Sequence, residues 1–116
     1  MHEFSIVEGI LETVKDTAKA NNLVSVSSVR IRVGEMRSVA HEMLVFAFEI
    51  ASKETVAEGA ELVVEYVPVR LRCRACNFES GGTESAFVCP NCGHDKRDVA
   101  AGKELEILSL EGEDGI

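Results

Sequence analysis

Apolar residues near the start of the chain recur at intervals of three and four, the spacing that places side chains on one face of a helix. Within residues 5–22 these positions are Ile6, Val7, Ile10, Leu11, Val14 and Ala18. Ser5 followed by Glu8 fits a capping box, in which the serine accepts a first-turn N–H and the glutamate reaches back to the cap. We therefore expect a helix that begins at Ser5, with residues 1–3 projecting beyond it.

A second helix is predicted within residues 38–52, where apolar side chains occupy most of the helix circumference. Ser38 stands at the position of a side-chain cap. Because a helix that is apolar nearly all round is normally enclosed by other elements, we expect this helix to be the more buried of the two.

Three further stretches alternate between apolar and polar residues, as strands with one solvent-facing side do. They centre on residues 29–33, 62–66 and 105–110, and Gly34 and Pro68 end the first two. The element order is helix, strand, helix, strand, cysteine module, strand. We predict an α/β fold: a small three-stranded mixed sheet with two helices, plus an inserted four-cysteine zinc-ribbon-like module. The expected domains are residues 1–68 with 103–116, and residues 69–102.

Composition narrows the function classes. The chain has 116 residues and no apolar run near the roughly 20 residues that span a bilayer, and its first residues lack the layout of a secretory signal. We expect a cytoplasmic protein without membrane association. A formal net charge of -8 disfavours binding to nucleic acid. The segment 69–97 is less acidic, with five basic and three acidic residues.

Four cysteines form the strongest motif of the sequence. Cys73 and Cys76 enclose two residues, twelve residues follow, and Cys89 and Cys92 repeat the spacing. Two such pairs are typical of a tetrahedral four-thiolate zinc site, which is structural because no coordination position stays open for water. Asn77 and Gly93, the next residues after each pair, suit the positive φ that turns backbone N–H groups back towards the sulfurs. An iron site or redox dithiols remain alternatives.

The first residues, Met1, His2 and Glu3, could hold a different metal. A retained Met1 offers its α-amine, and His2 offers an imidazole and a backbone nitrogen, which together close two adjoining chelate rings in one plane. Nitrogen-rich planar coordination suits Ni(II) and Cu(II) rather than zinc. A histidine at position 2 is also common at an unstructured chain end without any function.

These features together resemble the HypA family of nickel metallochaperones. The opening "MHEFS", the stretch from Val33 to Cys73 and the paired cysteine motifs carry the resemblance, which covers essentially the full chain. It implies a protein that is not an enzyme. It implies Met1, His2 and Glu3 as nickel ligands and Cys73, Cys76, Cys89 and Cys92 as ligands of structural zinc.

The resemblance also implies partners. A HypB-type GTPase would supply the nucleotide chemistry, and the [NiFe]-hydrogenase large subunit would receive nickel, with urease as a second client. The chain has no GxxxxGK[ST] loop of its own. A homodimer is a further possibility that the sequence leaves open.

Several residues keep two interpretations. The Glu3 carboxylate either binds metal or only stabilises the positive end of the helix. His41 is most simply a polar residue of the second helix, whereas His94 is a candidate accessory metal ligand. Arg70, Arg72 and Arg74 alternate along one strand face, where they contact a partner or offset the negative charge of a four-thiolate zinc centre.

Two other function classes compete with a nickel carrier. A zinc-ribbon adaptor that binds nucleic acid or protein would exploit the less acidic module, although the module contains few aromatic residues and no long basic stripe. A thiol redox protein would need an exposed cysteine of low pKa that is not bound to metal.

Overall fold

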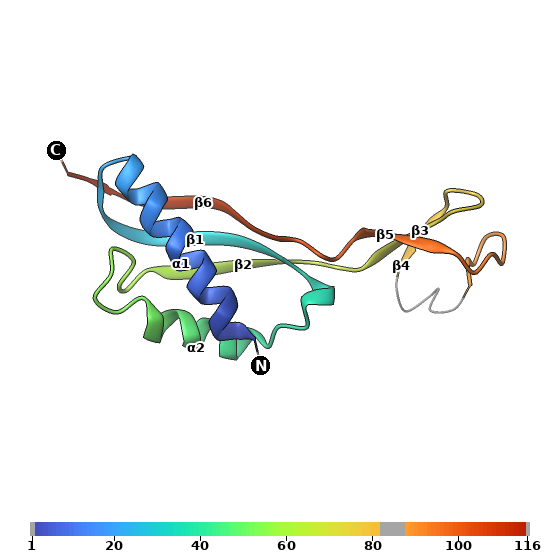
Figure 1. Ribbon diagram of the computed structural model, residues 1–116, viewed down its shortest axis with the longest axis horizontal. Helices are drawn as coiled ribbons and strands as arrows, with labels where there is room; N and C mark the ends of the chain where they lie inside the picture. Colours follow the sequence, from blue (N-terminus) through green and yellow to red (C-terminus); the bar gives the residue numbers. More distant parts are fainter. Residues whose placement is uncertain (1, 82–87, 116) are drawn as a thin grey trace. The chain divides into compact units, whose positions relative to one another are not determined.

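The structure, a computed structural model, describes residues 2–81 and 88–115 of the chain. Its elements are α1 (Glu3–Ala20), β1 (Leu23–Gly34), the short 3-10 helix η1 (Glu35–Arg37), α2 (His41–Ala51), β2 (Glu61–Val67), β3 (Arg70–Cys73), β4 (Glu79–Gly81), β5 (Arg97–Ala101) and β6 (Leu105–Asp114) (Figure 1). The predicted α/β fold, with two helices and an inserted cysteine module, is confirmed.

The chain divides into two compact units. The first, called here the helical unit, contains the residues up to Ile31, Val39–Glu65 and the residues from Glu106 onward. The second, called the cysteine unit, contains Arg32–Ser38 and Tyr66–Leu105. The cysteine unit therefore takes in seven residues that precede α2 in the sequence, because the turn around η1 packs on the segment near Gly102.

The larger sheet has the order β2-β1-β6, with β1 in the centre. The arrows in Figure 1 show β1 and β2 running in one direction and β6 in the other, so the sheet is mixed as predicted. Crossing from β1 to a parallel neighbour needs a helical connection, and α2 supplies it. The last strand extends to Asp114, so its acidic residues Glu111, Glu113 and Asp114 lie in a strand while they stay exposed.

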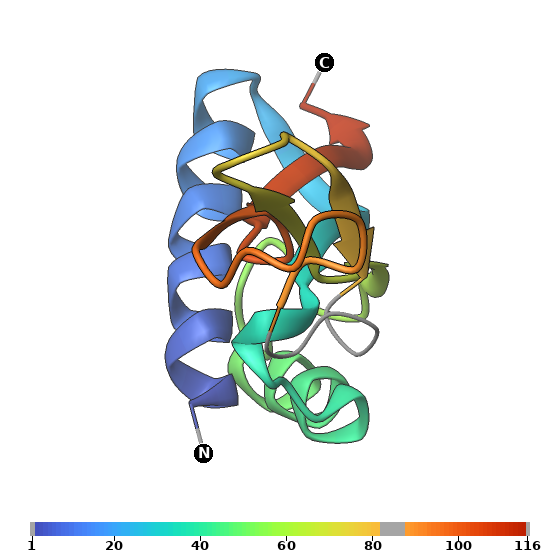
Figure 2. The same cartoon turned by 90° about the vertical axis from the view of Figure 1, so that its right-hand side faces the viewer.

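The core of the helical unit forms where α1 packs on the sheet. The predicted apolar face of α1 is buried at Ile6, Val7, Ile10, Leu11, Val14 and Ala18. Val29 and Ile31, two alternate residues of β1, are buried as well, and so is Val26. Figures 1 and 2 show α1 lying across the sheet and α2 beside the amino-terminal half of α1. Asn22 ends this helix region at φ 57, as its residue type predicted.

The predicted start of α1 is wrong. The helix begins at Glu3 rather than Ser5, His2 is the N-cap residue, and no side chain makes a capping hydrogen bond. Ser5 and Glu8 lie exposed within the helix, and Glu3 is buried instead of projecting beyond it. The reason is a tertiary contact: the Glu3 carboxylate accepts a hydrogen bond from the Ala40 N–H, which fixes the first turn.

The predictions for α2 need two corrections. Ser38 does not cap it, because Ser38 adopts a left-handed conformation at the end of η1 and Ala40 is the N-cap residue. The helix is also not the more buried of the two. Only Leu44, Ala47 and Phe48 among its eleven residues are buried. Of the remaining apolar side chains of α2, Phe46 and Ile50 are exposed and Met43 and Val45 are half-buried.

The cysteine unit is built on a small antiparallel sheet of order β4-β3-β5. In the central strand, Leu71 pairs with Ser80 on β4 and with Val99 on β5, and an irregularity follows Arg70. Gly34 lies so close to Gly102 that a Cβ at position 34 would come within 2.1 Å of the Gly102 carbonyl oxygen. This contact needs a residue without a side chain.

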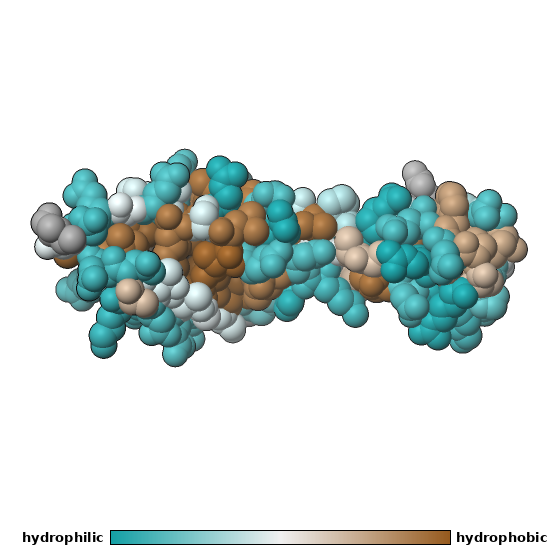
Figure 3. All heavy atoms as spheres, turned by 90° about the horizontal axis from the view of Figure 1, so that it is seen from above, coloured by the Kyte–Doolittle hydropathy of each residue, from teal (hydrophilic) through white to brown (hydrophobic). Residues whose placement is uncertain are grey.

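Apolar side chains also reach the surface of the helical unit. An open groove of about 630 Å³ separates α1 from β6, lined by Thr13, Thr17, Leu108 and Leu110 among others. Figure 3 shows apolar residues gathered over this unit, and Leu108 is exposed there. Within the described ranges, no helix is long and apolar enough to cross a membrane.

Candidate metal centres

The four cysteine sulfurs converge on one point. Their Sγ atoms all lie within 4.8 Å of one another, with Cys73 and Cys92 at 3.5 Å and Cys76 and Cys89 at 3.8 Å. Four thiolates at about 2.3 Å from a central zinc ion would be about 3.8 Å apart in a tetrahedron. The sulfur positions therefore fit a tetrahedral metal ion, and the cysteines are free of disulfides.

The two cysteine pairs sit on turns with the same hydrogen-bond pattern. In the first turn, the Cys73 N–H donates to the Phe78 carbonyl, and the Asn77 N–H donates to the Cys73 carbonyl. In the second, the Cys89 N–H donates to the His94 carbonyl and the Gly93 N–H to the Cys89 carbonyl. Asn77 and Gly93 have φ values of 64° and 80°, so the predicted positive φ at both positions is confirmed.

Hydrogen-bond donors reach the Sγ atoms of Cys73 and Cys76, whereas the neighbouring Cys73 sulfur raises the pKa of Cys92 to about 12. The Ala75 N–H donates to the Cys73 Sγ at 3.3 Å, and the Asn91 side-chain amide donates to the Cys76 Sγ at 3.5 Å. The Asn91 amide, together with the Phe78 backbone, lowers the pKa of Cys76 to about 6. Thiolates are the ligand form that a soft metal requires. The sequence motif did not reveal Asn91 as a donor, since its role depends on the fold of both turns.

The alternating arginines are mostly engaged within the cysteine unit. Arg72 pairs with Glu79 at 2.9 Å, and Arg74 pairs with Asp98 at 2.8 Å. The first pair links β3 to β4, which carries Glu79. In the second pair, Arg74 directly follows β3 and Asp98 lies on β5. These contacts favour a structural role for the two guanidinium groups over a free basic patch.

The amino-terminal candidate begins at His2, because Met1 lies outside the described residues. His2 is exposed and is the N-cap residue of α1. Its carbonyl accepts the Ile6 N–H at 3.1 Å, the first hydrogen bond of the helix. The backbone of His2 is thus held by a rigid helix while its imidazole faces solvent, where a metal ion can approach.

Glu3 has a structural role in addition to any metal binding. Its side chain is buried, with an exposed fraction of 6%. Its carboxylate accepts the Ala40 N–H at 3.0 Å. This hydrogen bond, with a second one from the Glu3 N–H, lowers the pKa of the carboxyl group below its ordinary value. In a capping box a glutamate of the same helix accepts the N-cap N–H, whereas here Glu3 of α1 does this for α2.

The other histidines are not brought into a ligand cluster. Across residues 2–81 and 88–115, the four cysteines are the one group of three or more histidine, cysteine or acidic side chains with converging ligand atoms. His41 begins α2 and is exposed. His94 is exposed in the turn after Cys92, where its backbone completes the second turn, and its accessory role stays a prediction.

Comparison with known proteins identifies relatives along the whole chain. The family model described as "Hydrogenase/urease nickel incorporation, metallochaperone, hypA" matches residues 1–112. The hydrogenase maturation factor HypA of Streptomyces avermitilis is 43% identical over 117 residues, covering 99% of this chain and 89% of the relative. The HypA of Aquifex aeolicus is 37% identical, covering 96% of each chain.

Solved structures agree with the sequence relatives. The solution structure of the Ni metallochaperone HypA from Helicobacter pylori matches with a TM-score of 0.72 and 26% identity, covering 99% of this chain and 100% of that one. A second solution structure of a HypA protein matches with a TM-score of 0.74 and 28% identity, covering 97% and 96% of the two chains.

The match replaces the alternatives of a zinc-ribbon adaptor and a thiol redox protein. The range that the family model matches includes both features that the sequence singled out, the opening Met1 to Glu3 and the four converging cysteines. Members of that family carry metal and are not enzymes. The chain belongs to the HypA family and is a nickel metallochaperone for hydrogenase maturation.

Proposed function

We propose that the chain binds Ni(II) at its amino terminus. The ligands are the Met1 α-amine, the backbone nitrogen and imidazole of His2, and the backbone nitrogen of Glu3. The observation that carries the proposal is the exposed His2 at the N-cap of α1, beside a Glu3 whose carboxylate is hydrogen-bonded to Ala40. With its carboxylate held there, Glu3 contributes most simply through its backbone.

The four cysteines hold zinc in this proposal, and the zinc is structural. Four thiolates fill a tetrahedral coordination sphere, so no position stays open for a substrate or water. The sulfur separations of 3.5 and 3.8 Å support zinc, and the two matching turns around Asn77 and Gly93 support a ligand pair from each turn. The metal would supply folding energy to a unit whose strands are short.

Nickel transfer would involve two partners in the cytoplasm. A HypB-type GTPase times the release, and the [NiFe]-hydrogenase large subunit receives the metal, with urease as a second client. We propose a functional division in which residues 1–68 and 103–116 hold nickel and residues 69–102 hold zinc. The compact units of the fold are bounded differently, because Arg32–Ser38 packs with the cysteine unit. An accessory contact of His94 with nickel, and a homodimer, remain predictions.

The test compares two histidine variants by equilibrium dialysis with Ni(II), followed by elemental analysis for nickel and zinc. His2→Ala should lose nickel binding and keep one zinc per chain. His41→Ala is the matched control, since His41 is also an exposed histidine near a helix start, and it should keep both metals. Retention of nickel by His2→Ala would refute the proposed site.

A further inference from the structure

The outward side of the two helices carries apolar side chains that the fold does not use. Phe46 on α2 is 50% exposed, and Ile50, one turn further along the same side, is 43% exposed. Phe4 in the first turn of α1 is 42% exposed. Exposed aromatic side chains grouped in this way are typical of interaction sites, because solvated apolar area is unfavourable unless a partner covers it.

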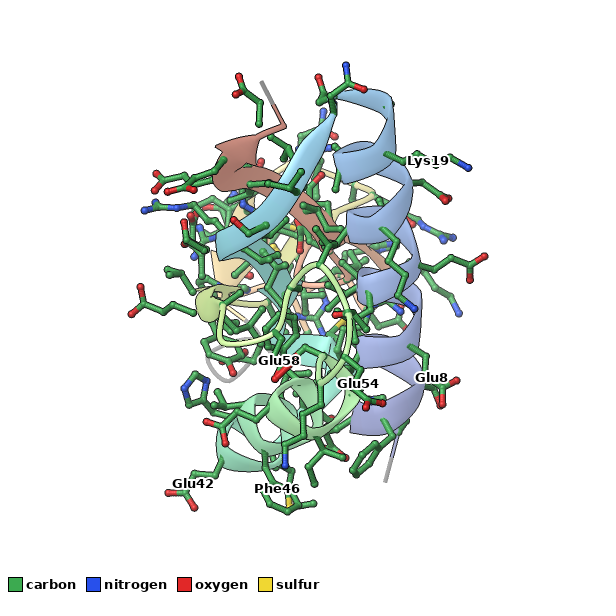
Figure 4. All side chains as sticks on the ribbon, turned by 90° about the vertical axis from the view of Figure 1, so that its left-hand side faces the viewer. Glu8, Lys19, Glu42, Phe46, Glu54 and Glu58 are labelled. Carbon is green, nitrogen blue, oxygen red and sulfur yellow. The ribbon has the colours of Figure 1, made fainter. Side chains whose placement is uncertain are left out.

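Phe4 lies in the first turn of α1, at the helix end that a hydrogen bond joins to the start of α2, the helix that carries Phe46 and Ile50. The 3.0 Å hydrogen bond between the Glu3 carboxylate and the Ala40 N–H joins the beginnings of α1 and α2. Phe4 follows Glu3 directly, and Phe46 lies within α2. Figure 4 shows Phe46 projecting from α2 away from the rest of the helical unit. His2 stands at the same end of α1, directly before Glu3 in the chain.

The charge of the residues around these side chains is mostly negative. Residues 2–14 and 40–52 contain no lysine or arginine, and their acidic residues are Glu3, Glu8, Glu12, Glu42 and Glu49. All of these except Glu3 are exposed. Figure 4 shows Glu42 on α2 and Glu8 on α1 with their carboxylates in solvent. Lys15 and Lys53 follow these stretches directly, and Arg37 precedes the second one. Lys53 is exposed and lies one turn beyond Ile50, so it is the basic residue of the rim.

We propose that Phe4, Phe46 and Ile50, with their rim of glutamates, form a docking surface for a partner protein segment that presents apolar side chains between lysines and arginines. We call it the Phe46 surface. It rests on the proposed function in one respect, because it would bring the partner close to the nickel ligands at His2. The class of partner follows from charge complementarity.

The charge also argues against other occupants. A second copy of this chain would place two glutamate rims face to face, and like charges across an interface are unfavourable. An anionic membrane surface would be repelled in the same way. A basic segment gains attraction from every exposed glutamate of the rim, and this attraction weakens as salt is added.

The test titrates the zinc-loaded protein with two synthetic peptides, followed by the backbone amide signals in NMR spectra. The peptides share the same leucine and phenylalanine positions on one helix face, and one carries lysines where the other carries glutamates. We expect the lysine peptide to bind, with shifts at residues 3–8 and 41–51, and to bind less tightly as salt increases. Equal binding of both peptides, or shifts confined to other residues, would refute the surface.

Two variants locate the binding energy. Phe46→Ser should lower the affinity for the lysine peptide by about tenfold or more, because a large apolar contact is lost. Leu108→Ser is the matched control, an exposed apolar residue on β6, and should bind as the parent chain does. Equal affinity of all three proteins, or a dimer of the parent that Phe46→Ser dissolves, would overturn the proposed occupant.

Nickel binding of both variants is measured separately. We expect it to be unchanged, since neither residue is a proposed ligand. If the parent chain does not bind nickel, the proposed function is refuted and the Phe46 surface is not. If it binds nickel but binds the lysine and glutamate peptides equally, the Phe46 surface is refuted and the proposed function is not.

Discussion

The Glu3 carboxylate accepts a hydrogen bond from the Ala40 backbone N–H at 3.0 Å, and this bond joins the starts of α1 and α2. Residues 3 and 40 are far apart in sequence, so the bond forms only in the folded helical unit. It explains why α1 begins at Glu3 and why α2 needs no side-chain cap of its own. The residues proposed to hold nickel therefore start from a fixed helix end.

The bond predicts a pH dependence. Because the pKa of Glu3 is lowered below 4.5 by the Ala40 N–H, its stabilisation is complete above about pH 4.5 and is lost as the pH falls through the lowered pKa. The Ala40 amide signal should titrate with Glu3 in NMR spectra. In Glu3→Gln this titration should vanish, whereas Glu8→Gln, the matched control at an exposed glutamate, should keep it. A Glu3 pKa at or above 4.5 would contradict the structure.

Replacing either of two glycines by alanine should change the stability of the protein, in opposite directions at the two positions. Gly34→Ala should destabilise the cysteine unit by about 2 kcal/mol or more, because its Cβ would meet the Gly102 carbonyl oxygen, which is backbone and cannot rotate away. Gly9→Ala, in the middle of α1 with nothing near the added carbon, should stabilise the protein by about 0.5–1 kcal/mol. Urea unfolding measures both, and equal effects would contradict the close approach.

Much of this architecture could be predicted from the sequence. Apolar residues recur regularly in α1 and alternate at Val29 and Ile31 because one face of each element is buried. Such spacing can be read directly from the sequence. Asn77 and Gly93 were predictable because their residue types tolerate positive φ. The start of α1 was not, because Ser5 and Glu8 satisfy a local capping rule that a distant backbone group overrides.

The exposed face of α2 could not be predicted from the sequence either. Hydrophobicity around the whole helix predicts burial, but it does not distinguish apolar residues that face the core from those that face a partner. Phe46 and Phe48 belong to the same apolar stretch, two residues apart, so their residue type does not tell which of them is buried. Phe48 is 1% exposed and Phe46 is 50% exposed. Only the packing of α2 on one neighbouring face separates them.

Removing the proposed zinc should affect one unit more than the other. When a strong chelator removes zinc, the NMR amide signals of the cysteine unit should lose the dispersion of a folded unit, because the turns of this unit depend on the converging sulfurs. The signals of α1 should persist, since its core contacts lie within the helical unit. Cys89→Ser should reproduce the effect without chelator. Simultaneous loss of the α1 signals would contradict independent stability of the helical unit.

The Asn91 side chain should tune metal affinity. Its amide donates to the Cys76 Sγ and is the main cause of the lowered pKa of Cys76. Asn91→Ala should weaken zinc binding by about tenfold in a competition titration with a chromophoric chelator, in line with other outer-shell contacts. Lys96→Ala is a control at an exposed side chain of the same unit. An unchanged zinc affinity would show that the contact does not reach the metal.

The central claim is that nickel is held where the polypeptide begins, by a ligand set that includes the free α-amine. The most direct measurement is a Ni(II) titration of a chain extended by three glycines before Met1, so that the α-amine no longer forms a joint chelate with the His2 imidazole, compared with the parent chain and with zinc content as the control. The account predicts that the extension lowers nickel affinity by about a hundredfold or more, equivalent to the loss of one strong ligand, while zinc stays at one per chain. Unchanged nickel affinity in the extended chain would contradict it.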